Sequence, residues 1–145
     1  MLDHTKKIKI LNRVYTRLNY SLFGGELLPV RIDIQNVSTL ENELYGVYRH
    51  DPTFGNSILL SYEFEDDIEK LTTQKKQVYF IVLVMLHEMI HQICDQHGLD
   101  DSNHSEAWQE QALSHGLYSL YEDGEMIEEY LLPLSIKIAD TIRIR

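Results

Sequence analysis

Hydrophobic residues recur at helical spacing at the start of the chain. Between residues 5 and 23, apolar side chains return every three or four positions and Gly24-Gly25 follows, which predicts an amphipathic helix with a glycine stop. In residues 30–35 apolar and polar side chains alternate singly, which is the period of a half-buried strand. Residues 44–49 and 57–62 predict two further strands. We therefore expect a small three-stranded, mostly antiparallel sheet after the first helix.

The longest apolar run lies in the second half of the chain. It predicts a long helix over residues 73–97 that ends at Gly98, with the acidic residues 63–69 before it as a loop or a short helix. A polar turn then leads to a further helix at residues 104–115, which stops at Gly116. The expected fold class is therefore α+β.

Weaker patterns follow the last of these helices. The acidic residues 122–130 predict a short helix that Pro133 breaks, and the isoleucines of residues 136–144 predict a strand or an extended tail. With 145 residues, the chain is long enough for one sizeable core and too short for two independent domains. We expect a single domain over residues 1–145.

An H-E-x-x-H motif, formed by His87, Glu88 and His91, stands inside the long apolar run. Residues four apart lie on one face of a helix, about one turn from each other, so the two imidazoles can bind a single ion. Zinc held by three protein groups keeps a position for water and lowers its pKa to about 7, and Glu88 can accept the proton. The motif predicts half of a catalytic zinc site for peptide hydrolysis.

Three kinds of residue could supply the remaining protein ligand. His97 has the spacing of a longer zinc motif, but Cys94 stands where that motif needs glycine to turn the chain. Glu106 and Glu110 could instead give a carboxylate ligand. His104 is favoured, because the polar turn before it can bring a new helix across the first one.

The order of these motifs resembles the SprT-like (Spartan-type) metallopeptidase domain. In that family the third zinc ligand sits in a His-Gly-x-x-aromatic segment, where His104 and Trp108 occupy the matching places and Ser105 replaces the glycine. The resemblance covers about residues 5–116 and leaves residues 117–145 as an acidic C-terminal extension. It rests on the H-E-x-x-H motif, the segment His104-Ser105-Glu106-Ala107-Trp108, Leu11-Asn12, and residues 22–29, 45–48 and 57–61.

This resemblance implies a zincin-like fold and a zinc-dependent endopeptidase. His87, His91 and His104 would hold zinc, and Glu88 would be the general base. A protein or peptide would be the substrate, and a strand edge near residues 57–62 could hold it in an extended form. The family's best-known substrates are proteins crosslinked to DNA, so DNA or DNA-bound protein is a partner by resemblance alone. Asp100, Asp101 and Glu106 are candidates to orient the imidazoles.

Charge and cysteine content limit the classes of partner. A formal net charge of -10 argues against a surface built to hold nucleic acid, and the one basic stripe, Lys9, Arg13 and Arg17, reads as a solvated helix face. A single cysteine excludes an internal disulfide and a cysteine-rich zinc ribbon within this sequence, which favours the cytoplasm. We expect no signal peptide and no membrane span, because Lys76 and the zinc motif interrupt the apolar run.

Two other hypotheses stay open on the sequence. A non-catalytic, zinc-stabilised protein-interaction module would use His97 as a fourth ligand and dock a partner through the acidic surface and tail. A metal-free reading makes the long helix an ordinary core element. Glu88 counts against the first, because a closed structural site has no use for a carboxylate at that place.

Overall fold

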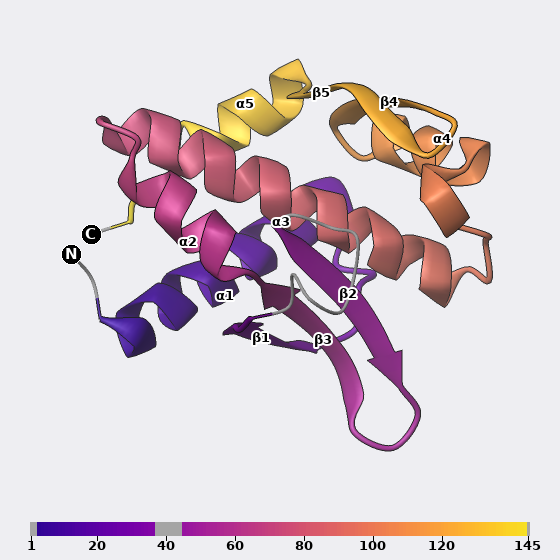
Figure 1. Ribbon diagram of the computed structural model, residues 1–145, viewed down its shortest axis with the longest axis horizontal. Helices are drawn as coiled ribbons and strands as arrows, with labels where there is room; N and C mark the ends of the chain where they lie inside the picture. Colours follow the sequence, from indigo (N-terminus) through magenta and orange to yellow (C-terminus); the bar gives the residue numbers. More distant parts are fainter. Residues whose placement is uncertain (1–2, 37–44, 145) are drawn as a thin grey trace.

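A long helix, α3 (Gln74–Gln96), runs through the centre of the molecule, and the other elements pack around it (Figure 1). The computed structural model describes residues 3–36 and 45–144. Within them the fold is α+β, with five α-helices, a three-stranded sheet and a two-stranded sheet. The helix matches the predicted span 73–97 closely, and Thr73 caps its first turn by accepting a hydrogen bond from the backbone N–H of Lys76.

Helix α3 is buried on nearly all sides, which explains its apolar composition. By length and composition it is able to cross a membrane, contrary to the expectation drawn from its polar residues. In the fold, however, 72% of that apolar window is buried inside the molecule, so α3 serves here as the core helix.

The three-stranded sheet is mixed, so the expectation of a mostly antiparallel sheet is wrong. Strands β2 (Gly46–Asp51) and β3 (Gly55–Leu60) form an antiparallel hairpin, whereas β1 (Val30–Ile34) pairs with β3 in parallel. Strand β3 is the central strand, and Ile58 and Leu60 at its apolar end are fully buried. The expected substrate-binding edge at residues 57–62 is therefore excluded for residues 57–60, since β3 has a partner on each edge.

The N-terminal half carries two capped helices. In α1 (His4–Leu22), predicted at 5–23, Asp3 accepts a hydrogen bond from the N–H of Lys6. The acidic stretch forms helix α2 (Tyr62–Glu69), and the hydroxyl of Ser61 caps its first turn by accepting a hydrogen bond from the N–H of Phe64. The face that α1 turns to the core consists of Ile10, Leu11, Val14, Tyr15 and Leu18.

The acidic segment 122–130 forms a hairpin rather than the predicted helix. Strands β4 (Leu117–Glu122) and β5 (Glu125–Leu131) pair antiparallel across the dipeptide Asp123-Gly124. Both turn residues have a positive φ, 52° and 79° respectively, and Asp-Gly is a preferred pair for such a tight turn. The hairpin therefore follows from its turn, which outweighs the helical propensity of the surrounding glutamates.

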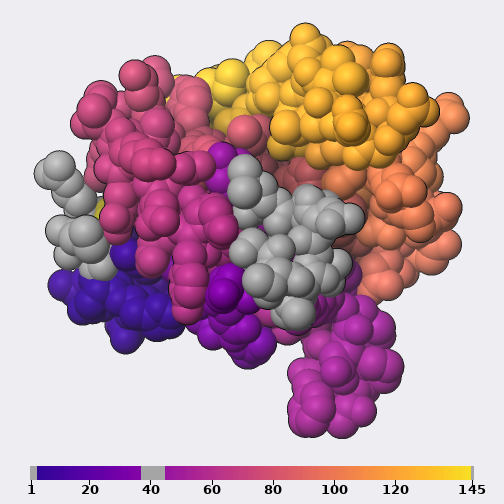
Figure 2. Space-filling model, viewed as in Figure 1, coloured from indigo at the N-terminus to yellow at the C-terminus, as the bar shows by residue number. Residues whose placement is uncertain are grey.

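Helix α5 (Pro133–Ala139) includes Ile136 and Ile138, for which a strand or an extended tail was predicted, whereas residues 142–144 follow it without regular secondary structure. Pro133 stands in the first turn, where the missing N–H costs nothing and the fixed φ suits a helix. The prediction treated Pro133 as a helix breaker, whereas it begins one. Figure 2 shows this C-terminal segment against the upper side of the molecule, while the β2–β3 hairpin projects at the lower edge.

Candidate metal centre

Three histidines converge beside the end of α3. His87 and His91 lie one turn apart on α3, and His104 belongs to a short 3₁₀ turn, η1 (Ser102–His104). The Nε2 atom of His104 lies 2.9 Å from Nε2 of His87 and 3.2 Å from Nε2 of His91. His87 and His104 are buried and His91 is half-buried. The three side chains that the sequence proposed as ligands thus meet at one point.

His104 reaches this point from a turn and not from a helix. The predicted helix 104–115 begins only with Glu106, in α4 (Glu106–Ser114), so the expectation that this helix carries His104 is wrong. Asn103 and His104 have φ values of 54° and 52°, a left-handed conformation that is uncommon outside glycine but that Asn and His adopt more often than most residues. The hydroxyl of Ser105 then caps α4 by accepting from the N–H of Trp108. The turn directs the imidazole back toward α3.

Carboxylates hold the outer nitrogens of the two helical imidazoles. Glu129 Oε2 lies 2.8 Å from Nδ1 of His87, and Asp101 Oδ2 lies 2.7 Å from Nδ1 of His91. An imidazole that donates its Nδ1–H to a carboxylate keeps a lone pair on Nε2. The two carboxylates thus occupy the Nδ1 side of each ring, and the Nε2 atoms of both rings face Nε2 of His104.

Of the residues expected to orient the imidazoles, Asp101 does so. Asp100 instead accepts a hydrogen bond from the N–H of Ser102, and Glu106 is exposed on α4. Glu129 was missed, because residues 122–130 were predicted to be helical. The signal that could have found it is the Asp-Gly turn, which makes the glutamates of this segment strand residues.

Aromatic rings enclose the cluster. The indole of Trp108 is fully buried, with its centroid 4.6 Å from His104, 4.8 Å from His87 and 5.3 Å from His91. Tyr121, on β4, stacks on His104 from another side. Burial, followed by the nearby His87 and His91, lowers the pKa of His104 to about 3. The imidazole of His104 is thus neutral over the physiological range, which is the form that binds metal.

Glu88 follows His87 on α3 and is only 2% exposed. A carboxylate this deeply buried is costly unless it serves a partner or a reaction. Because Glu88 stands three residues before His91 in α3, these two side chains are neighbours on the helix surface.

The other candidate ligands lie elsewhere. His97 directly follows the last residue of α3. Its side chain is exposed and pairs with Glu26. Glu106 and Glu110 are exposed on α4. Cys94 is buried, and burial raises the pKa of its thiol to about 12, so it is a packed apolar group and not a thiolate.

The cluster has the dimensions of a metal site. One ligand atom from each of the three histidines lies within 4.8 Å of the others, and among the described residues the group contains no fourth member. Tetrahedral zinc with Zn–N bonds of about 2.0 Å would separate two nitrogens by about 3.3 Å. The Nε2 separations of 2.9 and 3.2 Å are close to that value, so the three side chains are near enough to bind a metal ion.

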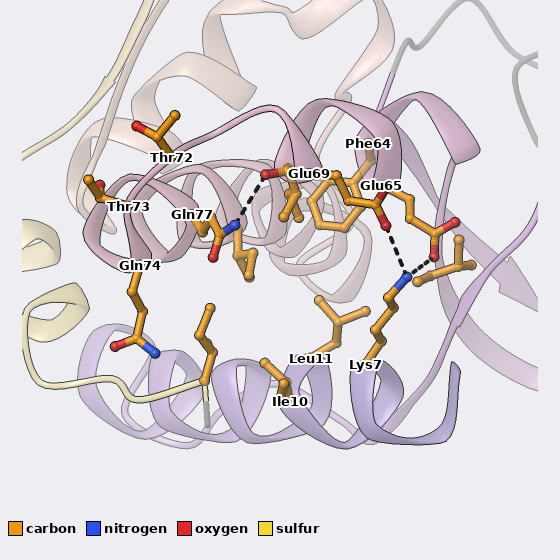
Figure 3. Close-up of a pocket in the computed structure, with 14 residues that line it drawn as sticks. Lys7, Ile10, Leu11, Phe64, Glu65, Glu69, Thr72, Thr73, Gln74 and Gln77 are labelled. Carbon is orange, nitrogen blue, oxygen red and sulfur yellow. Dashed lines mark hydrogen bonds and ion pairs between the residues drawn. The ribbon is translucent and has the colours of Figure 1, made fainter. Parts of the chain in front are cut away.

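A cavity of about 440 Å³ lies between α1, α2 and the start of α3, away from the histidines (Figure 3). Its walls are largely apolar, and Lys7 at its rim pairs with Glu65 and Glu69. The nearest lining residue of α3, Ile81, precedes His87 by a helical rise of roughly 9 Å. The cavity therefore does not form part of the candidate metal centre.

No family model, curated protein or solved structure matches this chain.

Proposed function

We propose that the protein is a zinc-dependent metallopeptidase with a SprT-like, zincin-like catalytic domain. One observation carries this proposal: His87, His91 and His104 bring their Nε2 atoms together beside the glutamate of the H-E-x-x-H motif. Three imidazoles are a ligand set that suits zinc, and three protein ligands leave a fourth position for water or substrate.

Bound zinc would polarise the scissile carbonyl and make an attacking water acidic enough to lose its proton near neutral pH. Glu88 is proposed to accept that proton and then to deliver it to the leaving amine. Asp101 keeps His91 in the correct orientation throughout.

The same geometry weighs against a non-catalytic zinc module. Structural zinc sites are closed by four protein ligands. His97, which would have to serve as the fourth, instead pairs with Glu26. Within residues 3–36 and 45–144 the cluster offers three ligands, which supports a site that retains an exchangeable position.

Strand β2 is the proposed docking site for an extended substrate. Among the described residues it is an edge strand of the three-stranded sheet, with β3 as its neighbour, and extended peptides commonly add to a sheet at such an edge. Its Tyr48 hydroxyl donates a hydrogen bond to Asp95, one turn beyond His91 on α3. An extended peptide on β2 would therefore run close to the proposed zinc.

The Glu88→Gln variant tests the proposed chemistry. It preserves the volume and the hydrogen-bonding oxygen of the side chain but cannot accept a proton. We expect it to bind zinc as the wild type does and to lose peptidase activity by at least about a thousandfold on an unfolded protein substrate. Glu110→Gln, at an exposed position of α4, is the matched control. Full activity in Glu88→Gln would refute the role of Glu88.

A further inference from the structure

We infer that Glu129 is a positioning residue of the metal centre, so that the C-terminal hairpin completes a site whose ligands all come from earlier in the chain. This inference rests on the proposed metal site. Glu129 lies outside both the H-E-x-x-H motif and the segment around His104, and it reaches the centre only because β4 and β5 fold back over α3.

The carboxylate of Glu129 is held between two partners. Its Oε2 accepts a hydrogen bond from the Ser119 hydroxyl at 2.9 Å and lies 2.8 Å from Nδ1 of His87. Ser119 and Glu129 face each other across the hairpin, so the register of the two strands sets this contact. The side chains of His87 and Glu129 are 9% and 11% exposed, which shields their interaction from water and salt.

The hairpin is itself anchored on the core. Leu117 at one end of β4 and Leu131 at the end of β5 are buried and face each other in the register. The turn at Gly124 lies beside Asn103, the residue before His104. Packing at both ends leaves the Glu129 carboxylate little freedom to move away from His87.

This contact has two consequences for His87. It fixes the imidazole as the tautomer with hydrogen on Nδ1, and it sets the plane in which Nε2 points at the metal. It also makes the imidazole a stronger ligand for a cation, because a hydrogen bond from Nδ1–H to a carboxylate raises the basicity of Nε2. Loss of such an outer partner weakens metal affinity by roughly 10- to 100-fold in other metalloproteins.

The experiment compares zinc dissociation constants, measured by competition with a chromophoric chelator at fixed pH. Glu129→Ala should bind zinc about 10- to 100-fold more weakly than the wild type. Glu129→Gln, which retains an accepting oxygen, should fall between the two. Glu128→Gln changes the exposed neighbour on the same strand and should bind as the wild type does.

A second readout separates positioning from general damage to the fold. In the wild type, NMR of the zinc-bound protein should show a downfield, slowly exchanging Nδ1–H on His87, and this signal should shift in Glu129→Gln and vanish in Glu129→Ala. Ser119→Ala should shift it less, because it removes only the partner that steadies Glu129. The free energy of unfolding without metal, measured in urea, should stay within about 1 kcal/mol for Glu129→Gln.

The possible failures differ from each other. If the wild type itself binds no zinc, the proposed function fails. If the wild type binds zinc and Glu129→Gln and Glu129→Ala match it in dissociation constant and in the His87 signal, the positioning role of Glu129 is refuted while the zinc site stands.

Discussion

The phenol ring of Tyr121 stacks on the imidazole of His104, with ring centroids 3.9 Å apart and planes only 8° apart. His104 sits in a left-handed turn, so the stack supplies part of the packing that holds its ring in place. Aromatic pairs of this kind are worth about 1 kcal/mol beyond their buried area. We expect Tyr121→Leu to weaken zinc binding roughly fivefold, by chelator competition, and Tyr121→Phe to retain most of the affinity.

Tyr118 provides the control for that experiment. It lies on the same strand but stacks on Tyr130, with centroids 4.8 Å apart, and takes no part in the histidine cluster. Tyr118→Leu should leave zinc affinity unchanged. Equal losses in Tyr118→Leu and Tyr121→Leu would mean that hairpin stability, and not the stack on His104, governs binding.

Trp108 should report metal binding directly. It is the only tryptophan in the sequence, and its indole contacts all three histidine rings. We expect zinc to change the emission of Trp108 with a stoichiometry of one ion per chain. Copper(II), a quencher that binds imidazoles strongly, should reduce the emission by more than about half. If neither metal changes the emission of Trp108, the metal binds elsewhere in the protein.

The segment that supplies the proposed metal ligands is strongly acidic. The chain has no Lys or Arg between Gln77 and Ile136, and Asp95 and Asp123 are exposed near the two ends of the histidine cluster. The negative electrostatic potential of such a segment attracts positively charged peptides. Peptides rich in Lys and Arg should therefore be cleaved with a kcat/KM about tenfold above that of acidic peptides of equal length.

Salt provides the check on that preference. The Debye length falls from about 10 Å at 0.1 M salt to about 3 Å at 1 M, so the preference for basic peptides should largely disappear in 1 M sodium chloride. A preference that survives high salt would arise from a pocket contact instead.

Because of Tyr15, we expect the free energy of unfolding to fall at alkaline pH. Its hydroxyl lies 2.8 Å from both the Leu28 carbonyl and Gln92 Oε1, and burial raises its pKa to about 12. Between pH 10 and 12 the unfolded chain loses this proton while the folded chain keeps it, so the free energy of unfolding falls as pH rises. Urea unfolding at pH 9 and pH 11 should show a smaller fall for Tyr15→Phe.

The same variant has a cost at neutral pH. Removing the hydroxyl leaves the buried Gln92 oxygen with one partner fewer, so Tyr15→Phe should be less stable by about 1 kcal/mol at pH 7. An unchanged alkaline slope in Tyr15→Phe would show that other tyrosines, such as Tyr45 with its pKa raised to about 12, account for the effect.

Local patterns predicted the parts of the fold that depend on local physics. The helical period and the glycine stops located α1 and α3, and the spacing of His87 and His91 placed both imidazoles on one face. The polar turn after α3 was enough to predict that His104 could return to that face. These features depend on neighbours within a few residues, which a sequence displays directly.

Pairings between distant segments were not predictable in this way. The parallel contact of β1 with β3 depends on which strand takes the centre, and no local pattern encodes that choice. In β5 the side chains of Met126, Ile127 and Tyr130 are all exposed, so the strand lacks the alternation that would identify it. Glu129 was missed as a partner of His87 for this reason.

X-ray absorption at the zinc edge of the purified wild-type protein tests the central claim most directly. The account predicts about one zinc per chain, bound by three imidazole nitrogens at about 2.0 Å together with one exchangeable oxygen ligand from water. Replacing His104 with alanine should remove one imidazole from that shell. A protein that binds no zinc, or one whose zinc keeps the same ligands in His104→Ala, would contradict the account.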